Sequence, residues 1–314
     1  MKSADFLVGD TDPAGYVVLP RPPRRDAASV REALVAFKVP ADWWDHCDVT
    51  TSAIDGSPIQ PEIDLRIGWP DPARPLDDLA RAVDLGLGLA IHPQAELDLS
   101  TLGLTIAEAP RLRIGGLRRV AGWAVLASAK AERAVIGGAS EPVPPMPNAR
   151  VVNAVGGNAA GAAASPKLKF LTVDLMGEAW PEGVAIGPSV ASIQIIGARR
   201  LNEVPPLSEP LSLRTFRIDG APGLDLGGLR KATNLTWVDL SRIASVTSFD
   251  ALAHAASLAE LELSGVRHID SWMWLGDSSI ERVVVESSVG MPQALADDWM
   301  ARHSGWWIRQ ARAR

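Results

Sequence analysis

A strand-like apolar pattern recurs along the chain at nearly constant spacing. In residues 258–263, LAELEL, leucine falls at the first, fourth and sixth positions of a unit. The sixth position, taken as a marker, recurs at intervals of 22 or 23 residues, at Val173, Ile195, Ile218, Leu240, Leu263, Val285 and Ile308. A single unit of this length cannot bury its own apolar face. The period therefore predicts units that stack on their neighbours.

Toward the N-terminus the spacing between markers alternates between long and short. Going backward from Val173, the markers are Val151, Ile136, Ile114 and Leu99, so a full period is followed each time by a shorter step. After a marker, apolar residues recur at every third position, as at Val266, Ile269, Trp272 and Leu275. This spacing favours tight arcs of 3₁₀ helix over α-helix. We expect Trp272 to lie in the core and Trp274 to point outward from its arc.

These units resemble the leucine-rich repeat family, in the short internalin-like bacterial form of about 22 residues, from about Ala95 to Arg309. The resemblance implies an α/β solenoid, right-handed and curved, with a concave parallel β-sheet and irregular or 3₁₀ convex arcs. The chain departs from the family at the ninth position. There the family usually has an asparagine that bonds adjacent coils, and this sequence has Ala198, Ala221, Ile243 and Val266. We expect packing, more than an asparagine ladder, to hold the coils together.

The rhythm is not recognisable before about residue 95, so we divide the chain there. Residues 1–94 are expected to form a capping region of mixed helix and loop, with helices over residues 24–37 and 75–86 and a further turn from Pro40. Such a cap is needed because an open end exposes core and strand edges. Residues 95–314 are expected to form the solenoid, with a closing helix at 292–303 and a closing strand at 305–310.

Composition excludes several classes of protein. The net charge of −6 argues against general affinity for nucleic acid or membrane surfaces. Asp5 and Asp10 stand where a secretory signal would be apolar, and no apolar run of about eighteen residues occurs. The single cysteine cannot form an intrachain disulfide. We expect a cytoplasmic protein.

The sequence shows no recognisable catalytic set. The five histidines have no metal-ligand spacing, and the glycine-rich stretch AVGGNAAG lacks the lysine of a phosphate loop. Cys47 follows His46, but we interpret it as a buried thiol near Trp43 and Trp44 and not as a nucleophile. We expect no cofactor, no metal and no enzymatic activity.

The sheet of such a solenoid offers a binding surface. The third, fifth and seventh positions of each unit point away from the core, and ten coils would span about 45 Å. The first unit places Glu96, Asp98 and Ser100 on this face. Arginines gather early on it and carboxylates, including Asp219, gather late. The predicted partner-binding residues are Arg111, Arg113, Arg133, Arg150, Phe170, Arg217, Trp237, Asp239, Glu260, Glu262, Arg282 and Glu286.

These features favour a non-catalytic module that binds a folded protein through its concave face. The specific hypothesis is a bacterial immunity or inhibitor protein, monomeric when unbound, against a toxin or effector with a basic surface. One alternative is a scaffold or regulator for an endogenous partner. A second is an enzyme with a site near Trp43, Asp45, His46 and Cys47. The charges are also compatible with a solvated face that has no partner.

Overall fold

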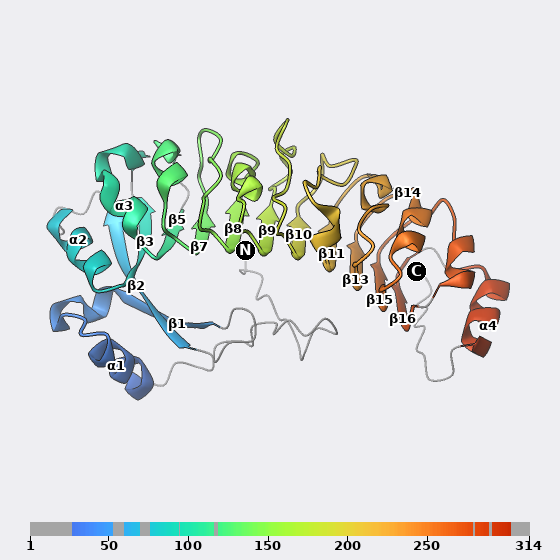
Figure 1. Ribbon diagram of the computed structural model, residues 1–314, viewed down its shortest axis with the longest axis horizontal. Helices are drawn as coiled ribbons and strands as arrows, with labels where there is room; N and C mark the ends of the chain where they lie inside the picture. Colours follow the sequence, from blue (N-terminus) through green and yellow to red (C-terminus); the bar gives the residue numbers. More distant parts are fainter. Residues whose placement is uncertain are drawn as a thin grey trace. The chain divides into compact units, whose positions relative to one another are not determined.

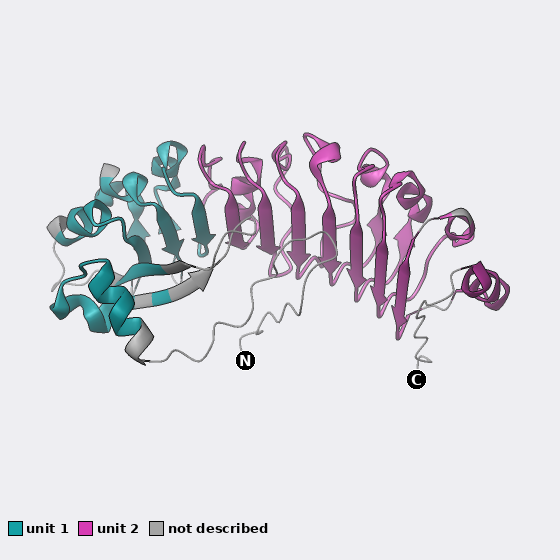
Figure 2. Cartoon of the chain, turned by 60° about the horizontal axis from the view of Figure 1, so that its bottom comes forward, with its two compact units in different colours: residues 1–140 teal, residues 141–314 magenta. Residues whose placement is uncertain are grey.

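The computed structural model describes residues 27–52, 60–69, 76–93, 95–115, 119–278, 280–288 and 291–302. The chain divides into two compact units, residues 1–140 and 141–314, which Figure 2 colours separately. Both units are built mainly on parallel strands with few helices (Figure 1). This arrangement is compatible with an α/β solenoid.

The sheet of the second unit has seven parallel strands that hydrogen-bond in chain order. They are β8 (Val151–Val155), β9 (Phe170–Asp174), β10 (Ser192–Ile196), β11 (Thr215–Asp219), β13 (Trp237–Ser241), β15 (Glu260–Ser264) and β16 (Arg282–Glu286). Val173, Ile195 and Ile218 pair with one another in register, and Ile218, Leu240, Leu263 and Val285 continue the same row. All six side chains are at most 1% exposed. The predicted inward column is confirmed from Val173 to Val285; Ile308 lies outside the described residues.

The arcs between these strands lie on the other side of the unit from its sheet (Figure 2). They contain 3₁₀ helices, as the three-residue spacing predicts: η4 (Asn158–Ala164), η5 (Pro210–Ser212), η6 (Gly227–Leu229), η7 (Phe249–His254) and η8 (Met273–Asp277). Two short strands, β12 (Leu224–Asp225) and β14 (Val246–Thr247), pair to form a second small sheet.

Of Trp272, which directly precedes η8, and Trp274 within it, only the first follows the prediction. Trp272 is buried, as expected. Trp274 does not simply point outward: its ring lies edge-on against Phe249, with centroids 5.4 Å apart. Its indole nitrogen is buried and makes no hydrogen bond.

Packing holds the coils at the ninth position, where Ala198, Ala221, Ile243 and Val266 are all buried. Several different side chains also tie one coil to the next. Asp270 accepts hydrogen bonds from the backbone N–H groups of Ser248 (2.7 Å) and Phe249 (3.3 Å).

Other coils use other residues for the same purpose. Ser288 Oγ accepts from the N–H of Val266 at 2.9 Å, and Glu178 accepts from the N–H of Gly157. The coils of this unit are thus held by varied side-chain contacts as well as by packing.

The residue directly after several strands has a left-handed backbone conformation. Gly197 (φ 63°), Gly220 (φ 86°) and Gly265 (φ 67°) follow β10, β11 and β15. Glycine reaches this region without a steric penalty. Arg242 follows β13 with φ 52°. Because a side chain is disfavoured there, a compensating contact of Arg242 is expected.

The first coil of the second unit is shorter than predicted. Ala154, and not Val151, pairs with Val173, so this step falls short of the regular period. The arc η4 can be short because it contains only small residues after Asn158, NAAGAAA. A Cβ added at Gly161 would lie 2.3 Å from the carbonyl oxygen of Val143, so the backbones approach closely there.

The first unit has four parallel strands and one antiparallel strand at its edge. They are β1 (Cys47–Ser52), which runs antiparallel to β2, and β2 (Gln60–Trp69), β3 (Gly88–Pro93), β5 (Arg111–Ile114) and β7 (Arg133–Ile136). Parallel pairing thus begins at β2 and not near residue 95, which corrects the predicted start of the rhythm. Ile67 of β2 pairs with Ile91 of β3 at close to the regular period, and α2 lies between the two strands.

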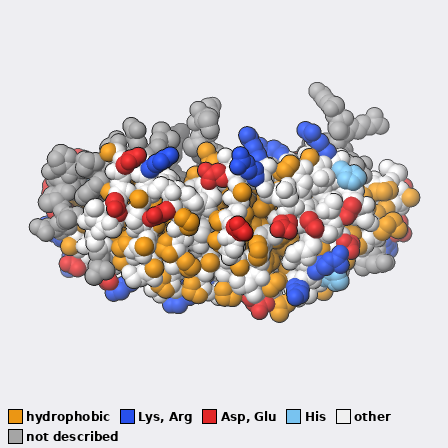
Figure 3. All heavy atoms as spheres, turned by 90° about the horizontal axis from the view of Figure 1, so that it is seen from above, with side chains coloured by type: hydrophobic (Ala, Val, Ile, Leu, Met, Phe, Trp, Pro, Cys, Tyr) orange, Lys and Arg blue, Asp and Glu red, His pale blue; other side chains and the backbone are white. Residues whose placement is uncertain are grey.

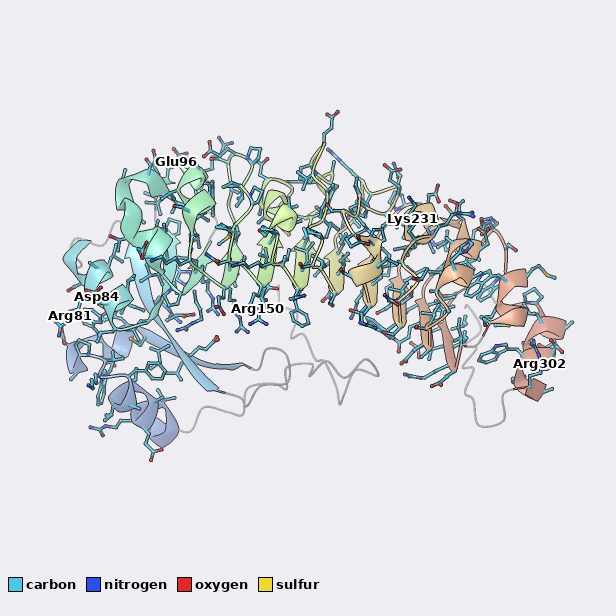
Figure 4. The ribbon with its side chains drawn as sticks, viewed as in Figure 1. Arg81, Asp84, Glu96, Arg150, Lys231 and Arg302 are labelled. Carbon is cyan, nitrogen blue, oxygen red and sulfur yellow. The ribbon has the colours of Figure 1, made fainter. Side chains whose placement is uncertain are left out.

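Within this unit the marker Leu99 is wrong and the markers Ile114 and Ile136 are right. Ile136 pairs with Ile114, and Ile114 pairs with Ile91, which lies one full period earlier. Leu97–Asp98 instead form β4, which pairs with β6 (Val120–Ala121), and Leu99–Leu102 form η2. Glu96 therefore lies on the side that carries the helices, as Figure 4 shows.

The predicted helices are present. They are α1 (Ala27–Ala36), α2 (Leu76–Asp84) and α4 (Gln293–Arg302), and the turn after Pro40 is η1 (Ala41–His46). Two further helical segments, α3 (Leu104–Glu108) and η3 (Trp123–Ser128), follow η2. The predicted strand at 305–310 lies outside the described residues. No helix in the described part of the chain has the length and apolar character needed to cross a membrane.

Candidate functional site

The outer face of the second unit is defined here as the strand residues that point away from its core. In each strand they occupy the third, fifth and seventh positions of the unit, and they pair across strands in register. The predicted positions are correct from Phe170 onward. In β8 the face holds Val151, Asn153 and Val155, so Arg150 precedes the strand and is not in these rows. Figure 4 labels Arg150 on the strand side of the unit.

Cross-strand ion pairs cover the part of the outer face on β11, β13, β15 and β16, which we call the charged half. Arg217 Nε lies 3.1 Å from Asp239 Oδ2, although it forms no hydrogen bond of good geometry there. Arg282 binds Glu260 and lies 3.6 Å from Glu262. These pairs join each strand to its neighbour, one repeat away in the chain.

A further pair comes from outside the strands. Arg242, the residue with the left-handed backbone after β13, binds both carboxylate oxygens of Asp219. This bidentate contact is the compensation expected for its backbone conformation. Sequence reasoning missed Arg242. The available signal was an arginine at a turn position that other coils fill with glycine.

These pairs make the carboxylates of the charged half unusually buried for a sheet surface. Asp239 and Glu260 are 5% and 6% exposed. Burial raises the pKa of Asp239, while Arg217 and a hydrogen bond from Ser241 act in the opposite direction. A buried carboxylate is costly to keep ionised unless its ion-pair and hydrogen-bond partners are present.

Glu262 is the more accessible carboxylate, with its side chain 32% exposed. Partial burial raises its pKa, and the neighbouring charges of Asp239 and Glu286 raise it further, while Arg217 lowers it. Burial is the largest of these effects on the pKa of Glu262.

The part of the outer face on β8, β9 and β10, which we call the neutral half, has a different character. Among the nine face residues of these strands only Asp174 is charged, and it accepts a hydrogen bond from the N–H of Met176 at 2.9 Å. Val155 is 42% exposed, and Phe170 and Ile196 are half-buried. The two halves meet between β10 and β11, with Trp237 half-buried on β13.

In the first unit, the predicted block of positive charge is largely neutralised. Arg111 Nε lies 3.2 Å from Asp64 Oδ1 and also donates to the carbonyl of Ile63. Arg133 donates to Glu62 Oε2 at 2.9 Å. Arg113, on β5, is half-buried. The two carboxylates come from β2, which the sequence pattern did not place in the sheet.

The region around Cys47 differs from the prediction in one detail. Cys47 begins β1 and is half-buried, less than the fully buried thiol we expected. Trp43 is buried, with the guanidinium of Arg81 5.6 Å from its ring centroid. His46 is exposed. In the described ranges no group of three or more His, Cys, Asp or Glu residues is arranged to hold a metal ion.

Figure 3 shows the side that carries the arcs, where acidic and basic side chains lie among apolar and uncharged ones. One ion pair there joins Arg230 to Asp250 at 3.2 Å, and both side chains are about half exposed. Such an exposed pair contributes little to stability.

A scan of the chain against protein-family models finds no match, and a search among curated proteins finds no significantly similar sequence.

Proposed function

We propose that the chain is a non-catalytic protein-interaction module in the cytoplasm. In this proposal it is a leucine-rich-repeat-like, right-handed curved solenoid that binds a folded protein through the outer face, on its concave side. The observation that carries the proposal is the charged half of the outer face, where carboxylates are held on strands by cross-strand arginines.

Fixed side chains favour binding because little conformational entropy is lost when a partner docks. Arg217, Asp239, Glu260 and Arg282 are all held by ion pairs, and Trp237 lies among them as a large aromatic surface. Tryptophan and arginine are the residues most enriched at energetic hot spots of interfaces. A row of strands also suits a broad protein surface better than a small metabolite.

The specific form of the proposal is a bacterial immunity or inhibitor protein that occupies a toxin or effector. It is supported by the acidic face, which would cover a basic surface, and it predicts a toxin gene next to the gene for this chain. The alternative is a scaffold for an endogenous partner, which predicts no such neighbour.

Site-specific photo-cross-linking in the native host tests the proposal. A photoreactive residue replaces Gln194 or Val284, both half-buried on the outer face, in separate variants. A control variant carries it at Met273, which is 75% exposed in the arc η8. We expect one discrete protein adduct from the outer-face positions and none from the control. Adducts of equal yield from all three positions, or none from the face, would refute the proposal.

A further inference from the structure

The two halves of the outer face differ in how far their polar side chains are already bound within the chain. In the charged half, Arg217 and Arg282 are ion-paired to carboxylates of neighbouring strands. In the neutral half, one row of in-register residues crosses β8, β9 and β10 and consists of Asn153, Thr172 and Gln194. Within the described part of the chain, these three side chains form no hydrogen bond.

The polar atoms of this row, which we call the amide–hydroxyl row, reach the surface. Asn153 is exposed, and Thr172 and Gln194 are half-buried. None of their side-chain oxygen or nitrogen atoms is buried without a partner. By contrast, the hydroxyl of Ser192, in the adjacent row, is already bonded to Thr215 at 2.6 Å. The amide–hydroxyl row therefore combines exposure with unused hydrogen-bonding capacity.

The chemistry of the row matches that of a peptide main chain. An amide or hydroxyl side chain carries both a donor and an acceptor, and so does each peptide unit. A phosphate group only accepts and an ammonium group only donates, so either would use half of this capacity. The row crosses three strands, or about 10 Å, which is also the length of about three residues of extended chain.

The rows on either side of the amide–hydroxyl row are partly apolar. Phe170 lies in one of them and is half-buried, while Val155 and Ile196 lie in the other, with Val155 42% exposed. Asp174, between the last two, accepts the hydrogen bond from the N–H of Met176. Successive side chains of an extended chain point to opposite sides. A segment bound over the row would therefore place them in turn on the two apolar flanks.

We infer that the partner docks a short, extended and uncharged segment of its main chain on the amide–hydroxyl row. The segment runs across β8, β9 and β10, and its apolar side chains contact Phe170 on one flank and Ile196 on the other. An uncharged segment suits this half because burying a charge without a partner is costly. This inference rests on the proposed function, because it names the part of the protein partner that the outer face holds.

The experiment uses the full chain and the partner identified from the adduct at Val284. The purified partner is titrated at low and at moderate salt against wild type, Gln194→Met, Thr172→Val and the control Thr247→Val. The two face variants keep the approximate shape of the side chain and remove its hydrogen-bonding groups. Thr247 is exposed in β14, outside the outer face, so the control makes the same chemical change elsewhere.

We expect Gln194→Met and Thr172→Val each to weaken binding about tenfold, because a main-chain group of the partner is then buried without a hydrogen bond. The loss should be the same at both salts, since ions screen charges and not neutral groups. Thr247→Val should bind as wild type does. In amide hydrogen exchange, wild type should protect one short continuous stretch of the partner, and Gln194→Met should protect it less.

Unchanged affinities for both face variants would overturn the inference, while the adduct at Val284 would still support the proposed function. A salt-dependent loss, or the absence of a continuous protected stretch in the partner, would overturn the main-chain contact. Binding of wild type to an oligosaccharide that both face variants lose would assign the row to carbohydrate and also overturn it. If no face-specific adduct forms, the proposed function fails and this inference fails with it.

Discussion

The two units neutralise their sheet arginines in different ways. In the first unit, Arg111 and Arg133 pair with Asp64 and Glu62, which β2 supplies from 47 and 71 residues earlier in the chain. In the second unit, Arg217 and Arg282 pair with carboxylates one repeat away, on the next strand. The first arrangement draws its carboxylates from a strand far back in the chain, whereas the second draws them from the neighbouring repeat.

The difference concerns where a sheet arginine finds its carboxylate. In the second unit the partner lies one repeat away, so counting residues locates it. In the first unit the partners come from β2, a strand that the count did not include. The residue type alone therefore does not identify a binding surface, because it does not show which charges lie beside it in space.

The largest expected effect concerns the core beneath the charged half. Leu240 is fully buried in the inward column, and Leu240→Ala should lower the free energy of unfolding by about 2–5 kcal/mol. Denaturant titration of both proteins measures the change. A loss below about 1 kcal/mol would show that the strands of this unit do not share one packed column.

The second prediction compares the arginines directly. Arg282→Ala leaves the buried carboxylate of Glu260 without its guanidinium and should cost about 1–3 kcal/mol. Arg133→Ala should cost less, because Glu62 keeps Arg111 at 3.9 Å. Denaturant titration ranks the two variants.

The exposed pair of Arg230 and Asp250 provides the control for this ranking. Arg230→Ala should change the free energy of unfolding by less than about 1 kcal/mol. A larger cost for Arg133→Ala than for Arg282→Ala would reverse the comparison between the units.

The third prediction uses pH. Because the pKa of Glu262 is raised, the folded chain binds more protons than the unfolded chain just above the ordinary glutamate pKa, and its stability falls as pH rises through that range. Glu262→Gln removes this dependence. Its stability relative to wild type should increase from about pH 4 to about pH 7, by less than about 1 kcal/mol.

Asp225 in the same unit should show the opposite sign. Hydrogen bonds from Ser248 and from the N–H of Gly227 lower its pKa, so its contribution to stability is lost as pH falls through the lowered value. Relative to wild type, the free energies of unfolding of Glu262→Gln and Asp225→Asn should therefore change with pH in opposite directions. Parallel pH profiles would contradict the opposite pKa shifts of Glu262 and Asp225.

The smallest effect is expected at Cys47, in the first unit. Cys47→Ser should leave partner binding and any biological activity unchanged, as measured in the same titrations and in the native host. A loss of activity in a folded Cys47→Ser protein would support the alternative of an enzymatic site near His46.

Much of the second unit could be predicted from the sequence because its coils are local and repeat. The column from Val173 to Val285, the 3₁₀ arcs and the outer-face positions of Trp237 and Glu262 all follow from counting residues. The ion pairs of Arg217 and Arg282 join residues that the count places side by side on neighbouring strands.

The remaining features were missed for other reasons. Ile67 pairs with Ile91, and Ile91 with Ile114, at close to the regular period, but the count went through Leu99 and left out β2 and β3, and with them Glu62 and Asp64. The short alanine-rich coil after Val155 shifts the count and misplaces Arg150. The Arg242 contact depends on a backbone conformation that spacing cannot reveal.

The varied ties between coils have a consequence for local unfolding. An asparagine ladder would make all coil junctions alike. Here one junction is held by Asp270, another by Ser288 and a third by Glu178, each through a different geometry. Junctions of unequal strength should open at unequal free energies, so native-state amide hydrogen exchange should divide the second unit into steps and not report one cooperative block.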